Sequence, residues 1–122
     1  MSGIAQAAQA DRFSVAHRMV GDVRVVVVRG EIDHDVTNDL RHALLPEDDA
    51  APPARIVVDL GGVSFMDSSG INVFVAAHQA MSGTDGWLRI AAARKPVLHV
   101  LRLVGVDSLI TCHPTLEQAL AA

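Results

Sequence analysis

The feature that most constrains the fold is a run of residues that is apolar at every position rather than at alternate positions. Residues Val25 to Val28 are four consecutive valines. β-branched residues favour strands, and a strand that is apolar throughout must be buried on both faces. Such strands lie in the middle of sheets that carry helices. The run therefore predicts an α/β fold in which these valines form a central strand.

The composition agrees with an aliphatic α/β core. Half of the 122 residues are apolar, but only 3% are aromatic, so Val, Leu, Ile and Ala must fill the interior. A chain of this length fits one domain. We expect residues 1–10, which are rich in Ala and Gln, to be a flexible leader, and residues 11–122 to form the single domain.

Strand-like and helix-like segments alternate along the chain. A hairpin comes first, turning at Gly21-Asp22. Asp35 or Thr37 is positioned to cap the first helix, Pro46 ends it, and a polar loop follows over Glu47 to Pro53. The order β-β-α-β-α-β-α-β-α predicts a mixed, mostly parallel sheet of four to five strands with about four helices. The expected strands are Phe13–Val20, Val23–Arg29, Arg55–Leu60, Trp87–Ala93 and Leu109–Thr111, and the expected helices run from about 35 to Leu45, from about 68 to Ser82, over Val97–Val104 and over Pro114–Leu120.

Several classes of function are disfavoured. The net charge is −4 and no cluster of Lys and Arg stands out, which argues against nucleic-acid binding. No run of 18 apolar residues predicts a membrane span, and no signal peptide opens the chain. The single cysteine, Cys112, favours a reduced, cytoplasmic protein in which this thiol is packed and quiet. The six histidines show no metal-ligand spacing, so neither a metal nor a cofactor is expected.

The most informative segment runs from Val57 to Ile71. A buried strand is followed by Phe65-Met66-Asp67-Ser68-Ser69-Gly70, and the two serines stand where a helix begins. Serines at that place are most often only helix caps. A phosphate there would also meet free N–H groups and the positive end of the helix dipole. Residue 66 is Met, so Ser68 is not in a Gly-x-Ser-x-Gly nucleophile elbow, and no hydrolase is expected.

This segment resembles the signature of the STAS family, specifically of its anti-anti-sigma factors. Phe65 to Ile71 is similar to that signature without a gap, and Gly30 to His34 is similar to a Gly-Glu-Leu-Asp-His stretch of the family. A weaker likeness covers Pro96 to Val106. Gly61-Gly62, in what is expected to be a turn, and Asn72 depart from the usual pattern.

The resemblance implies a regulator of transcription in the bacterial stress response, and not an enzyme. It implies that the unmodified protein binds an anti-sigma factor that is also a serine kinase, and so frees a sigma factor. Phosphorylation of Ser68 would break that complex, and a metal-dependent phosphatase would restore it. Carried over to this chain, Asp67, Ser69 and Gly70 shape the acceptor loop. Asp33, His34 and Met66 are the implied partner-binding residues.

Two alternatives stay open within the same family. The chain could be a subunit of a membrane lipid-transport ATPase complex, although those commonly lack the pair of serines. It could also be a scaffold of a large stress-sensing assembly, which usually carries an additional N-terminal domain. The sequence does not decide the oligomeric state.

Overall fold

The computed structural model describes residues 12–45 and 55–122. The leader expected over residues 1–10 and the polar loop expected over Glu47 to Pro53 lie outside these residues. Within them the chain forms a mixed sheet with four α-helices and two short 3-10 turns, in the predicted order. The strands are β1 (Ser14–Val20), β2 (Val23–Ile32), β3 (Arg55–Met66), β4 (Trp87–Ala91) and β5 (Cys112–His113); the helices are α2 (Thr37–Leu44), α3 (Ser68–Met81), α4 (Lys95–Leu103) and α5 (Leu116–Ala121), with the 3-10 turns η1 (His34–Val36) and η2 (Val106–Ser108).

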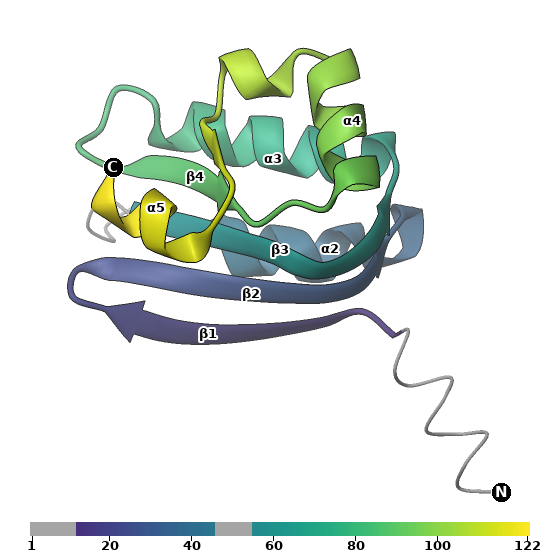
Figure 1. Ribbon diagram of the computed structural model, residues 1–122, viewed down its shortest axis with the longest axis horizontal. Coiled ribbons are helices and arrows are strands. Elements are labelled where there is room, and N and C mark those ends of the chain that lie inside the picture. Colours follow the sequence, from purple (N-terminus) through teal and green to yellow (C-terminus); the bar gives the residue numbers. More distant parts are fainter. Residues whose placement is uncertain (1–11, 46–54) are drawn as a thin grey trace, which may run out of the picture.

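The five strands lie in the order of the sequence, from β1 to β5. β1 and β2 are antiparallel, and every other neighbouring pair is parallel. Val20 pairs with Val23, so Gly21 and Asp22 alone form the turn of the hairpin, as predicted. Because the connections between parallel strands pass over the sheet, the helices lie against it (Figure 1).

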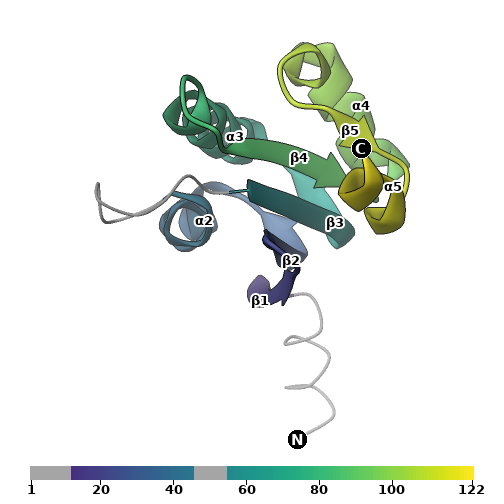
Figure 2. The same cartoon turned by 90° about the vertical axis from the view of Figure 1, so that its left-hand side faces the viewer.

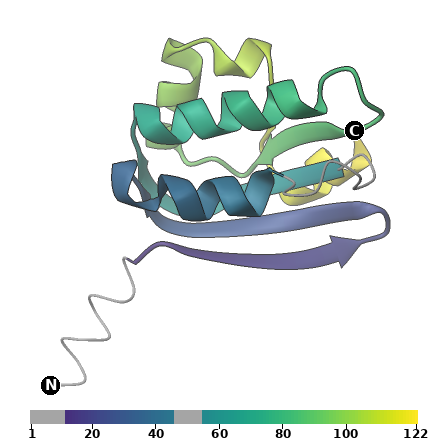
Figure 3. The same ribbon diagram turned by 180° about the vertical axis from the view of Figure 1, so that it is seen from behind.

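As the sequence predicts, the valine run lies inside the sheet, between β1 and β3, and three of its four valines are buried while Val27 is half-buried. Val25 and Val26 point to opposite faces of β2 and neither is exposed at all. α2 and α3 cover one face of the sheet, and α5 lies on the other (Figures 2 and 3). The larger core cluster joins the first face to α2, α3 and α4, and the smaller one packs Val57 and Ala91 against Ala119 of α5.

Arg89 holds the last helix onto β4. Its guanidinium donates a hydrogen bond to the carbonyl of Ala119 over 2.9 Å, and it lies 3.6 Å from the centre of the Trp87 ring. Trp87 is half-buried, which fits the packing of this face of the sheet. Arg89 and Trp87 therefore serve the packing of α5 against β4.

β2 and β3 are both longer than predicted. We expected Gly30 to leave the sheet and Gly61-Gly62 to form a turn. Instead the two strands stay paired as far as Ile32 and Met66, with two irregularities in register. Glycine within a strand commonly marks a bulge, and Gly61 donates its N–H to the Asp59 carboxylate over 2.9 Å.

Two other predictions needed correction. The edge strand expected at Leu109–Thr111 lies at Cys112–His113, because Ile110 is used in the core and η2 ends just before it. Neither Asp35 nor Thr37 caps a helix by accepting a backbone hydrogen bond. The hydroxyl of Thr37 instead donates to the carbonyl of His34 over 2.9 Å.

Position 30 requires glycine, because β2 there packs closely against the backbone of Arg12 and Phe13. The φ of Gly30 is +92°, and a Cβ placed there would lie 2.7 Å from the carbonyl carbon of Arg12 and 2.8 Å from the nitrogen of Phe13. Backbone atoms cannot swing aside as a side chain can. Gly21 also has a positive φ, +60°, but a Cβ placed on it would point into open space, with no atom beyond its chain neighbours within 4 Å.

We therefore expect Gly30→Ala to lower the free energy of unfolding by about 3 kcal/mol, from backbone strain plus the clash. Gly21→Ala is the matched control, and it should cost only about 1–2 kcal/mol because it carries the strain alone. Urea unfolding of the three proteins measures both costs. Equal costs would contradict the close approach at Gly30.

Cys112 is half-buried on the short edge strand β5. Burial raises the pKa of its thiol above the ordinary value, and the nearby Asp107 carboxylate raises it further, while Arg102 acts in the opposite direction. The folded state therefore favours the neutral thiol. The stability that this preference contributes is present below the pKa of an unfolded cysteine and is lost as the pH rises through the folded pKa.

We expect alkylation of Cys112 by iodoacetamide at pH 8 to be slower than that of the urea-unfolded chain, because the thiolate is the reactive species. The rate should rise at a higher pH than it does for the unfolded chain, because the pKa of the folded thiol is raised. Asp107→Asn should move the rate profile to lower pH, since it removes one of the two causes. A profile that matches the unfolded chain would show an accessible, unperturbed thiol.

Candidate functional site

The two motifs singled out in the sequence meet at one edge of the sheet. Ile32 ends β2, Met66 ends β3, and the two residues are paired in register. Just beyond them, the N–H of Asp67 donates a hydrogen bond to the carbonyl of Ile32 over 3.1 Å. The turn that begins at Asp33 and the turn that begins at Asp67 are therefore fixed side by side.

Asp67, and not a serine, caps helix α3. Its carboxylate accepts the N–H of Ser69 over 2.8 Å, and its carbonyl accepts the N–H of Gly70 over 3.2 Å. The simple interpretation that the serines serve as caps does not hold for Ser68. This residue is the first of the helix and is exposed, and its hydroxyl makes no hydrogen bond to another described residue.

Gly70 lets helix α3 pack closely on the ends of the two strands. A Cβ at this position would lie 2.6 Å from Cγ2 of Ile32 and 2.8 Å from Cγ of Met66. The first turn of α3 consequently has no room to move toward the sheet. Gly70 thus holds the predicted acceptor loop through packing, and Asp67 and Ser69 hold it through a hydrogen bond.

Met66 lies in the core rather than on the surface. Its side chain is only 2% exposed and packs against the first turn of α3. The structure therefore does not offer Met66 for direct contact with a partner. Met66 acts on the site indirectly, by packing against Gly70 from the core.

Asp33 and His34 form the neighbouring turn. Asp33 is half-buried and its carboxylate accepts the N–H of Asp35 over 3.0 Å, which caps η1. His34 is exposed beside it. The two residues are placed where a partner at Ser68 would meet them, and their role in binding stays a prediction.

Phe65 is a surface residue of the motif to which the sequence pattern assigns no role. Its side chain is 48% exposed, and Ser64 before it is exposed as well, whereas Val63 and Met66 are buried. β4 pairs with β3 only as far as Asp59, so residues 60–66 have no strand on that side. The signal in the sequence is an aromatic residue directly before the turn at Asp67, but its exposure depends on where β4 ends and could not be predicted.

The two turns at this edge are acidic. Glu31 and Asp35 are exposed, Asp33 and Asp67 are half-buried, and no Lys or Arg lies between Gly30 and Leu40 or between Gly62 and Gly86. The chain itself thus brings no cation from these segments to balance a further negative charge at Ser68.

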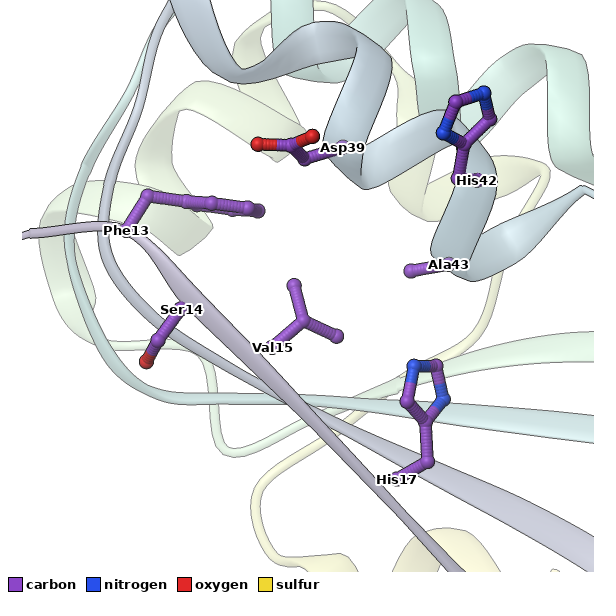
Figure 4. A pocket seen from close by; sticks show the side chains of 7 residues that line it. All are labelled: Phe13, Ser14, Val15, His17, Asp39, His42 and Ala43. Carbon is purple, nitrogen blue, oxygen red and sulfur yellow. The ribbon is translucent and has the colours of Figure 1, made fainter.

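A separate groove of about 330 Å³ lies between β1 and α2 (Figure 4). None of the acceptor-loop residues lines it. Two histidines do, but among the described residues no group of three or more His, Cys, Asp or Glu could hold a metal ion. The groove is lined by Phe13, Ser14, Val15, His17, Asp39, His42 and Ala43.

No helix in the described part of the chain is both long enough and apolar enough to cross a membrane.

Comparison with known proteins supplies the family. An anti-sigma F factor antagonist from Paenibacillus polymyxa is 24% identical over 98 residues, which are 80% of this chain and 84% of that protein. An anti-sigma factor antagonist from Mycobacterium paratuberculosis has a similar structure, with a TM-score of 0.80, 29% identity, and coverage of 91% of this chain and 93% of that one. The anti-sigma factor antagonist SpoIIAA in its unphosphorylated form gives a TM-score of 0.70 at 22% identity, with coverage of 88% and 93%.

The STAS domain family itself matches residues 15–119, from β1 into α5. This span holds nearly the whole sheet and both turns of the edge described above. The chain therefore belongs to the STAS domain family.

Proposed function

We propose that this chain is an anti-sigma factor antagonist that is switched by phosphorylation of Ser68. The unmodified protein binds an anti-sigma factor that has serine kinase activity, and a sigma factor is released. The kinase transfers phosphate to Ser68 and ends the interaction, and a metal-dependent phosphatase reverses it. The protein acts in the bacterial cytoplasm, as a substrate of the kinase and not as an enzyme.

The observation that carries this proposal is the state of Ser68. A kinase needs a hydroxyl that protrudes, is not engaged elsewhere, and is held in a defined position. Ser68 is exposed, and its neighbours Asp67 and Gly70 are held by the hydrogen bonds and packing described above. The named function of the relatives from Paenibacillus polymyxa and Mycobacterium paratuberculosis supports the same assignment.

The exposed residues beside Ser68 suit a protein interface. Phe65 offers an aromatic side chain, and His34 offers a polar one on the adjoining turn. Aromatic residues surrounded by polar groups commonly carry much of the binding energy of an interface. We place the partner across Phe65, Ser68 and the turn at Asp33-His34.

Phosphorylation acts through charge. A phosphoserine brings about 1.5 to 2 negative charges at neutral pH. They would stand among carboxylates, in a surface that the partner must desolvate on binding. A buried charge without a compensating cation is costly, so the complex is weakened while the domain stays folded.

The expected result is one phosphate on Ser68 when the protein is incubated with ATP and the anti-sigma kinase of the same organism. Ser68→Ala should abolish it, and Ser69→Ala should not, because Ser69 is half-buried and Ser68 is exposed. Intact mass and peptide mapping measure this. Phosphate on Ser69 would overturn the assignment of the acceptor.

Binding gives an independent test. Ser68→Asp should weaken the affinity for the kinase by about 30-fold or more, because a charge is then desolvated without a partner. If neither binding nor phosphate transfer occurs, co-purification from cells should recover a membrane ATPase or a large particle. Either result would support one of the other STAS roles in place of this one.

Phe65→Ala should lower the affinity for the same kinase by about 10-fold to 30-fold, as loss of an aromatic contact does at the centre of an interface. Because Phe65 is 48% exposed, the free energy of unfolding should change by less than about 1 kcal/mol. Leu103→Ala is the control, since Leu103 is 71% exposed on α4. Equal losses for the two variants would contradict the placement of the partner.

A further inference from the structure

The backbone N–H groups at the start of α3 depend on a single residue. The first N–H groups of any helix lack partners within the helix. Here the Asp67 carboxylate accepts from Ser69 over 2.8 Å, and the Asp67 carbonyl accepts from Gly70 over 3.2 Å and from Ile71 over 3.5 Å. Asp67 thus holds the turn in which Ser68 stands, without contacting the Ser68 hydroxyl.

Asp67 is itself fixed from the other side. Its N–H is bonded to the carbonyl of Ile32, next to the turn at Asp33. The close packing of Gly70 on Ile32 and Met66 prevents the helix from sliding toward the sheet. In this turn the Ser68 side chain is exposed, and the Asp67 carboxylate is held by its single bond to the Ser69 N–H.

A phosphate on Ser68 would compete with this carboxylate. Both groups are anions on adjacent residues, and both are attracted by the same N–H groups and by the positive end of the helix dipole. Two such charges about 6 Å apart at the surface repel by roughly 1–2 kcal/mol. The segments around the turn supply no Lys or Arg to relieve the repulsion.

We infer that Asp67 is a positioning residue with a second role, in which its negative charge converts phosphorylation of Ser68 into a structural change. In the unmodified protein its carboxylate caps the helix and holds the acceptor turn. In the modified protein the phosphate drives that carboxylate off the Ser69 N–H. The turn then loses its cap and, with it, the arrangement that the partner binds. This inference rests on the proposed phosphorylation of Ser68.

The substitution Asp67→Asn separates the capping role of this side chain from its negative charge. An asparagine side chain caps a helix about as well as aspartate does, and it is neutral. In Asp67→Asn the cap to Ser69 should therefore persist, and a phosphate on Ser68 should find nothing to repel. Asp33 provides the matched control, because it forms the same kind of bond, to the N–H of Asp35 over 3.0 Å, on the neighbouring turn.

The experiment places phosphoserine at position 68 by genetic encoding, in the wild type, in Asp67→Asn and in Asp33→Asn, and uses no kinase. Urea unfolding compares each protein with its unphosphorylated form. Phosphorylation should lower the folding equilibrium constant about tenfold more in the wild type than in Asp67→Asn, as expected for two close like charges. Asp33→Asn should behave like the wild type.

NMR gives a readout that stability alone does not. Three-bond couplings should show one side-chain rotamer at residue 67 in the unmodified protein, averaging in the phosphorylated wild type, and one rotamer again in phosphorylated Asp67→Asn. A fixed rotamer in the phosphorylated wild type, or equal effects of phosphate in all three proteins, would overturn the inference. Because no kinase is used, such a failure would leave the proposed function standing.

Discussion

The functional edge depends on the parallel pairing of β2 with β3. These two strands continue together beyond the end of β4 and close with the pair Ile32 and Met66. The next hydrogen bond, from Asp67 to Ile32, extends this pairing by one step into the turns. Two segments more than thirty residues apart in sequence are thereby held in one fixed arrangement. Without this pairing Asp33, His34 and Ser68 would belong to separate loops.

Three aspartates near this edge make the same local hydrogen bond to the backbone. Asp33, Asp59 and Asp67 each accept the backbone N–H of the residue two positions later, over 2.8 to 3.0 Å. One stabilises the bulged part of β3, and the other two begin the turns that follow β2 and β3. An Asp side chain forms such a bond readily because it is short and carries its acceptor close to its own backbone. The carboxylates of Asp33 and Asp67 at the edge thus have structural partners in the backbone.

The layout of the fold and the position of Ser68 could be predicted from the sequence. The valine run identified the central strand because burial on both faces leaves no polar position. The ends of β2 and β3 could not be predicted, since glycine in a bulged strand and glycine in a turn give the same local signal. The burial of Met66 follows from the packing of α3 on it, and the exposure of Phe65 follows from where β4 stops pairing; both are tertiary facts. The choice of Asp67 over a serine as the cap was equally hidden, because both residue types suit that position.

The acceptor site combines a rigid backbone with one unengaged side chain. Packing at Gly70 and hydrogen bonds through Asp67 fix the turn, whereas the Ser68 hydroxyl is exposed and makes no bond within the described residues. A hydroxyl used as the cap would have to leave the helix before it could accept a phosphate, which would add to the barrier of the transfer. Capping by the preceding aspartate removes that requirement. It also sets a negative charge beside Ser68, so in the proposed switch the residue that holds the turn is the one that a phosphate on Ser68 would disturb most.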